Sequence, residues 1–157
     1  MGTVSGISRV APHHGLSARQ TQDVAAMEPL AGRAVLIVED DADTLELYAT
    51  ALAKLGADTQ RATNADTAIA VMIAWRPDVV LCDLHMPGYD GYSVREFAEG
   101  DPLLCNVPMV AISGSHPCVE KERVHRVGFV QYLTKPTKMR DIVEALIAAI
   151  KTRRFVA

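Results

Sequence analysis

Short apolar runs of strand length alternate along this chain with segments of helical periodicity, and that alternation limits the fold more than any other feature. Residues 34–38 (AVLIV), 79–82 (VVLC) and 108–113 (PMVAIS) are almost wholly apolar. Such uninterrupted runs are typical of strands covered on both faces, as in a parallel sheet. Two weaker strands are predicted over residues 58–62 and 130–133.

Helices are predicted in the intervals between these strands and after the last one. Gly56 marks the end of the first helix, Asn64 is a typical N-cap for the second, and Pro77 prevents the second from continuing. The predicted helices cover about residues 45–55, 65–75, 92–99, 117–127 and 139–150. Strands that alternate with helices favour an α/β fold, in which a doubly wound, five-stranded parallel sheet has helices on both faces.

The chain length allows one such domain and an extension. Residues 1–32 lack a strand pattern and are interpreted as an N-terminal extension that is flexible or forms one short helix over residues 18–27, capped by Ser17. The domain itself is predicted to cover residues 33–154.

Composition excludes several classes of function. The net charge is −3 with no long basic run, so direct nucleic-acid binding is not expected. No apolar run approaches the length of about 20 residues that a membrane helix needs. Three cysteines without metal-type spacing suggest reduced thiols in a cytoplasmic protein.

Polar residues follow the predicted strands at the points where those strands end. Glu39 and Asp40 follow the first, Asp83 the third, Ser113 the fourth, and Lys135 the last. The carboxyl ends of parallel strands lie at one edge of a sheet, which is where sites form in such folds. Several carboxylates at that edge repel one another and require a cation, and Mg²⁺ suits them as a hard ion that pairs with phosphate.

Four motifs in order contain these residues: VLIVEDD, LCDLHMPGYDG, VAISG and YLTKP. Together they resemble the receiver domain of two-component response regulators, over about residues 33–153. The resemblance implies a flavodoxin-like, CheY-like sheet with strand order 2-1-3-4-5.

The resemblance also implies site roles. Asp83 would accept a phosphoryl group from a sensor histidine kinase or a histidine phosphotransfer protein. Asp40 and Asp83 would bind Mg²⁺ directly, Glu39 mostly through water, and the backbone carbonyl of His85 would complete the metal ligands.

Three further roles follow from the same resemblance. Lys135 would pair with the carboxylate and then with the phosphate, and its bond to Pro136 is expected to be cis. Ser113 would swing to hydrogen-bond the phosphoryl oxygen, and Tyr132 would act as a switch that turns inward when this hydroxyl moves. His85 and Ser115 depart from the usual pattern at positions that flank the phosphate, which bears on the lifetime of the phosphorylated state.

The leading interpretation is a stand-alone signalling receiver, not an enzyme, whose phosphorylation changes its contacts with a downstream effector protein, because the chain leaves no room for an output domain. One alternative is a receiver-like scaffold that binds without phosphorylation. Another is a phosphatase with an aspartyl nucleophile. Such enzymes typically have a second acidic residue two positions after the nucleophile, where this chain has His85.

Other polar and apolar positions have simpler interpretations. Asp41 is predicted to be a helix N-cap. The charged residues of the helix over residues 117–127 are interpreted as a solvated face that can border a partner surface: Glu120, Lys121, Glu122, Arg123 and Arg126.

The predicted helix over residues 65–75 is apolar on nearly all sides. Ala70, Ile73 and Trp75 stand where receivers commonly expose polar residues. A covering surface is therefore expected there, either the N-terminal extension or a partner chain, which includes a homodimer.

Overall fold

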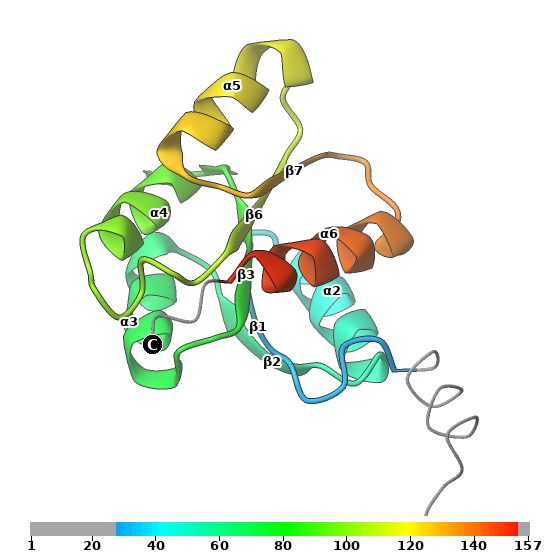
Figure 1. Cartoon of the computed structure of the whole chain (residues 1–157). Coiled ribbons are helices and arrows are strands. Elements are labelled where there is room, and N and C mark those ends of the chain that lie inside the picture. The colour runs from blue at the N-terminus through cyan, green and yellow to red at the C-terminus, as the bar shows by residue number, and fades with distance from the viewer. Residues whose placement is uncertain (1–27, 154–157) are drawn as a thin grey trace, which may run out of the picture.

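A five-stranded parallel sheet lies at the centre of the structure, with helices on both of its faces (Figure 1). The computed structural model describes residues 28–153. The sheet contains β1 (Ala34–Val38), β2 (Asp58–Ala62), β3 (Val79–Asp83), β6 (Met109–Ser113) and β7 (Gln131–Thr134). The helices are α2 (Ala42–Lys54), α3 (Ala65–Trp75), α4 (Gly91–Glu99), α5 (Pro117–Val127) and α6 (Met139–Thr152). The strand order β2-β1-β3-β6-β7 is the predicted order 2-1-3-4-5, so the fold prediction is confirmed.

Alternate side chains of the central strands point into two separate cores. Val35, Ile37 and Leu81 pack with α2 and α6 on one face. Leu36, Val38 and Val80 pack with α3, α4 and α5 on the other. Since side chains alternate between faces with a period of two residues, a strand buried on both faces must be apolar at every position. This explains the continuous apolar runs of β1 and β3.

The predicted helix ends agree with local hydrogen bonds. The Asn64 side chain accepts a hydrogen bond from the Thr67 backbone at 2.8 Å and begins α3. The Asp41 side chain does the same for Thr44 at 2.7 Å and begins α2, which confirms its predicted capping role. Gly56 adopts a φ of +92° just after α2, a conformation that favours glycine. Local sequence signals therefore determine where these two helices lie.

Two bounds differ from the predictions in a way that affects the site. Strand β3 extends through Asp83, one residue beyond the predicted end, and Asp83 pairs in register with Ile112 of β6. Strand β7 begins at Gln131, one residue later than predicted, and ends at Thr134. Asp83 is therefore held by the sheet itself.

A short antiparallel hairpin follows β3. It pairs β4 (His85–Met86) with β5 (Tyr89–Asp90) around Pro87 and Gly88. Proline followed by a glycine with a φ of +77° is the arrangement of a type II turn. The sequence analysis did not predict the pairing of the residues on either side of this turn.

The packed chain begins before Arg33. Leu30 is fully buried in the core beneath α2 and α6, and its backbone N–H donates to the Leu55 carbonyl at 3.1 Å. The short helix predicted over residues 18–27 lies outside the described residues. Within residues 28–153, no helix has both the length and the apolar character needed to cross a membrane.

The apolar face of α3 is smaller than predicted. Ile73 is 52% exposed and Ala70 is also exposed, whereas Trp75 is partly buried against the core beneath α3 and α4. Trp75 is therefore part of the domain's own packing, and the predicted covering of this helix concerns Ala70 and Ile73.

Candidate functional site

Three carboxylates meet where the chain reverses its direction of travel across the sheet. Glu39 and Asp40 directly follow β1, and Asp83 ends the neighbouring strand β3. One oxygen from each of the three lies within 4.8 Å of the others. In doubly wound folds, ligands bind at this switch point, at the carboxyl ends of the strands.

Lys135, which lies next to the edge strand β7, contacts two of these carboxylates. It follows β7, and its Nζ atom lies 2.8 Å from Glu39 Oε2 and 2.8 Å from Asp83 Oδ2. The second oxygen of Asp83, Oδ1, accepts a hydrogen bond from the His85 backbone at 2.9 Å. We call Glu39, Asp40, Asp83 and Lys135 the Asp83 cluster.

Burial and charge shift the pKa values inside this cluster. Burial opposes the charge of Lys135, but its hydrogen bonds to Asp83 and Glu39 outweigh burial and raise the Lys135 pKa. Burial raises the Glu39 pKa from 4.5 to about 7, with the Asp83 charge adding to the rise and the Lys135 hydrogen bond opposing it. Lys135 therefore stays charged, while the charge of Glu39 depends on a nearby cation.

The cluster fits a divalent cation. Three carboxylates face one ammonium group, so negative charge is in excess. Asp40 is exposed, whereas Glu39 and Asp83 are buried, so an ion could enter from the Asp40 side. Carboxylate oxygens are the ligands that Mg²⁺ takes, usually one or two from the protein with water completing its shell.

The backbone just after Asp83 folds back closely on itself. Gly91 donates its N–H to the Leu84 carbonyl at 3.0 Å. A Cβ atom at Gly91 would lie 2.3 Å from the Asp83 carbonyl oxygen and 2.9 Å from Cys82 Sγ. Only glycine fits there, because real Cβ atoms do not approach other heavy atoms so closely.

Ser113 lies at the end of β6, as predicted, but its hydroxyl bonds to a residue that the sequence analysis did not assign to the site. Ser113 Oγ donates to Glu120 Oε2 at 2.8 Å. The other oxygen of Glu120 accepts from Tyr92 Oη at 3.1 Å and lies 2.8 Å from His85 Nε2. We call Tyr92, His85, Ser113 and Glu120 the Glu120 cluster.

The interpretation of Glu120 as part of a solvated face is wrong. Glu120 is only 6% exposed, while its neighbours Lys121, Glu122 and Arg123 are exposed. One sequence signal could have indicated this: Glu120 precedes Val124 by four residues and so shares the buried side of α5.

Tyr132 and Ser115 lie beside the Glu120 cluster. The Tyr132 hydroxyl donates to the Ser115 carbonyl at 3.0 Å, and its ring packs partly buried against the core. Ser115 Oγ lies 3.0 Å from His85 Nε2. The switch role of Tyr132 and the metal-ligand role of the His85 carbonyl stay predictions. The bond between Lys135 and Pro136 is cis, as expected.

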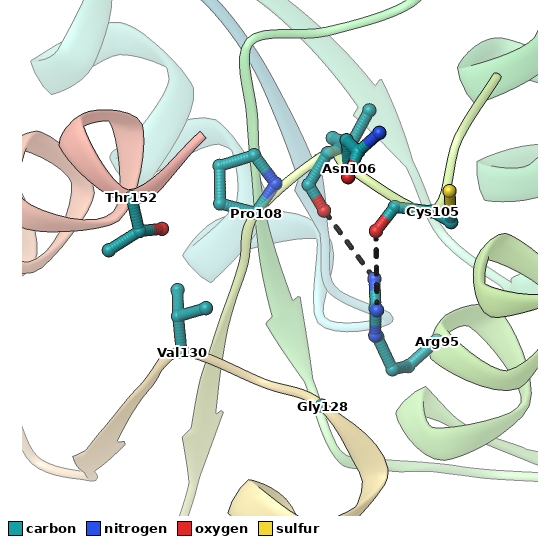
Figure 2. A pocket seen from close by; sticks show the side chains of 8 residues that line it. Arg95, Cys105, Asn106, Pro108, Gly128, Val130 and Thr152 are labelled. Carbon is teal, nitrogen blue, oxygen red and sulfur yellow. Dashed lines mark hydrogen bonds between the residues drawn. The ribbon is translucent and has the colours of Figure 1, made fainter. Parts of the chain in front are cut away.

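A buried cation, Arg95, lies at the opposite ends of the strands, beside a hollow near the amino ends of β6 and β7 (Figure 2). Arg95 is 5% exposed and pairs with Glu99. Its guanidinium also donates to the carbonyls of Val107 and Cys105, both at 3.5 Å. We call this group the Arg95 cluster, and it joins α4 to the chain that enters β6.

Comparisons with known proteins agree with this geometry. Residues 35–147 match the family model for the response regulator receiver domain. The phosphate regulon transcriptional regulatory protein PhoB of Pseudomonas aeruginosa is 30% identical over 78% of this chain and 53% of its own length. The polar-differentiation response regulator DivK of Brucella anthropi is 26% identical over 73% of this chain and 93% of its own length. The chain thus spans about half of PhoB and nearly all of DivK.

Solved structures show the same fold. A response regulator structure from Chloroflexus aurantiacus superimposes with a TM-score of 0.72 at 25% identity, covering 76% of this chain and 98% of that one. The receiver domain of the sensor histidine kinase PA1611 of Pseudomonas aeruginosa, solved with a magnesium ion coordinated in its active-site cleft, gives a TM-score of 0.70 at 26% identity over 77% of this chain and 99% of that one. This chain belongs to the response regulator receiver domain family, the signalling modules of two-component systems.

Proposed function

We propose that this protein accepts a phosphoryl group on Asp83 and signals through changed protein contacts. The proposal is supported above all by the position of Asp83, which is fixed by the sheet, by the His85 backbone N–H and by the Lys135 ammonium group. A nucleophile held so firmly loses little freedom when it reacts, and positioning is a large part of catalysis in phosphoryl transfer.

The reaction forms one bond and breaks another. A carboxylate oxygen of Asp83 attacks the phosphorus atom of a phosphohistidine on the donor protein, the P–N bond breaks, and the histidine nitrogen is left to take up a proton. Lys135 stabilises the charge that gathers on the phosphoryl oxygens. Mg²⁺, held by Asp40 and Asp83 and through water by Glu39, would supply further neutralisation of that charge.

The donor in this proposal is a sensor histidine kinase or a histidine phosphotransfer protein. The output is a changed affinity for a downstream effector. Phosphorylation shifts the protein between two conformations only as far as the phosphoryl group interacts more favourably with one conformation than with the other. A cytoplasmic location, where free Cys82, Cys105 and Cys118 stay reduced, belongs to the same proposal. So does a homodimer through the exposed part of α3.

Intact-mass spectrometry after incubation with acetyl phosphate and Mg²⁺ tests the proposal. We expect a gain of one phosphoryl group in the unaltered protein and none in Asp83→Asn. Asp66→Asn, an exposed carboxylate in the first turn of α3, is the matched control and should gain the group normally. A gain that persists in Asp83→Asn would place the acceptor elsewhere. A protein that gains nothing but still binds partners would favour the scaffold function.

A further inference from the structure

Glu120 is a buried carboxylate whose contacts connect three elements around the candidate site. Its oxygens accept hydrogen bonds from Ser113 at the end of β6 and from Tyr92 in α4, and one of them lies 2.8 Å from His85 Nε2 in the hairpin after β3. Charge-assisted hydrogen bonds of this kind are about twice as strong as neutral ones. The carboxylate therefore stabilises the arrangement in which all three side chains turn toward α5.

The Ser113 hydroxyl can serve only one acceptor at a time. A serine hydroxyl has a single proton, and in this structure that proton is donated to Glu120 Oε2 at 2.8 Å. The Ser113 oxygen itself accepts from the Ser115 backbone at 3.1 Å. A phosphoryl group on Asp83 presents oxygens that only accept hydrogen bonds. Ser113 must therefore leave Glu120 before it can bond to the phosphoryl group.

Glu120 cannot follow Ser113, because it is anchored from the other side. Tyr92, which donates to Glu120, is 2% exposed and packs edge-on against Phe129 with ring centroids 6.1 Å apart. The guanidinium of Arg123 lies 4.0 Å above the Tyr92 ring. When Ser113 turns away, a buried carboxylate oxygen loses its donor, and an unpaired buried acceptor is costly.

We propose that Glu120 is a positioning residue that retains Ser113 in the unphosphorylated arrangement and so limits how readily Asp83 holds a phosphoryl group. This inference rests on the proposed function of Asp83 and adds a specific opposing residue to it.

The test compares Glu120→Gln with the unaltered protein. Glutamine keeps the size of the side chain but offers Ser113 only a neutral acceptor. We expect the affinity of Asp83 for beryllium fluoride, a phosphoryl mimic, to rise on the order of tenfold in the presence of Mg²⁺. The yield of phosphorylated protein from acetyl phosphate should rise with it. Glu122→Gln, an exposed glutamate on the same helix, should leave both unchanged.

A double-mutant cycle separates the positioning role from a general structural one. Ser113→Ala removes the donor, so in that background Glu120→Gln should change the affinity for beryllium fluoride by less than about twofold. Thermal unfolding shows that each variant is folded. An equal gain in both backgrounds, or no gain in either, would overturn the role of Glu120. Absence of any mass gain in the unaltered protein would instead overturn the proposed function of Asp83, and this inference with it.

Discussion

The buried cation Arg95 lies at the amino ends of the strands and the partly buried cation Lys135 at their carboxyl ends, and the charges around these two cations are balanced differently. At the amino ends of the strands, Arg95 pairs with one glutamate, Glu99, and donates hydrogen bonds to backbone carbonyls. At the carboxyl ends of the strands, Lys135 is the single positive charge beside the three carboxylates of the Asp83 cluster. The Arg95 cluster has no excess charge and joins two segments of the fold, although Arg95 Nε has no hydrogen-bond partner. The Asp83 cluster has an excess of negative charge that a cation could neutralise, and an excess of charge held in place by a rigid sheet indicates function.

Removing the lysine should have the largest effect. In Lys135→Met we expect the rate of phosphorylation by acetyl phosphate to fall at least about a hundredfold, because the phosphoryl oxygens lose their fixed positive charge. The affinity for Mg²⁺ should rise, since the carboxylates then lack their own cation. Stopped reactions followed by intact mass give the rate, and calorimetry gives the affinity. The exposed Lys138→Met is the control, and a normal rate in Lys135→Met would contradict the comparison.

Replacing Arg95, the cation at the amino ends of the strands, should lower the stability of the protein without changing its phosphorylation rate. In Arg95→Met we expect the free energy of unfolding in urea to fall by about 2 kcal/mol, because buried carbonyls lose a donor while the apolar stem is kept. The phosphorylation rate should stay within about twofold.

Arg126→Met is a matched control for this change, since Arg126 pairs with Glu122 at the same i, i+4 spacing on an exposed face. Its unfolding free energy should change by less than about 0.5 kcal/mol. An equally small change in Arg95→Met would show that the Arg95 cluster contributes no more than an exposed ion pair.

The Mg²⁺ affinity of the Asp83 cluster should depend on pH. Because burial raises the Glu39 pKa to about 7, Mg²⁺ must displace a proton at lower pH, and its affinity should rise about tenfold between about pH 6 and about pH 8. Without metal, the folded state binds this proton more tightly than the unfolded chain does, so Glu39 should lower stability as pH rises from 4.5 to about 7. Calorimetry of Glu39→Gln should lack this pH dependence, and persistence of the dependence would assign it to another group.

A smaller effect is expected at a position outside all three clusters. Asn64→Ala removes the side-chain cap of α3 and should reduce the free energy of unfolding by about 1 kcal/mol. Mg²⁺ affinity and phosphorylation should not change. If they do, the site depends on overall stability, and the variants above would have to be compared at equal stability.

The sequence predicted the elements of this fold well because their signals are local. The cap at Asn64, the glycine after α2 and the apolar run of β1 each lie within a few residues of the structure they determine. The convergence of Asp40, Asp83 and Lys135 could also be predicted, since parallel strands bring their carboxyl ends to one edge.

What could not be predicted depends on contacts between distant segments. Glu120 lies among charged neighbours, and its burial results from Tyr92 and Ser113, which are 28 and 7 residues away in the chain. Leu30 is buried because it reaches Leu55 across the base of α2. Trp75 packs inward through the tertiary arrangement of α3 and α4. Helical periodicity can place a residue on the buried side of its helix, as at Glu120, but it does not identify such distant partners.

The close approach at Gly91 brings the backbone of α4 against the backbone of Asp83 without any side chain in between. The backbone of Gly91, the first residue of α4, lies close to the carbonyl oxygen of Asp83 and to the side chain of Cys82. A partner protein that displaced the start of α4 would therefore move the peptide unit of Asp83 directly, and strain at Asp83 would reach the outer surface by the same route. The Gly91 backbone would then transmit movement in both directions.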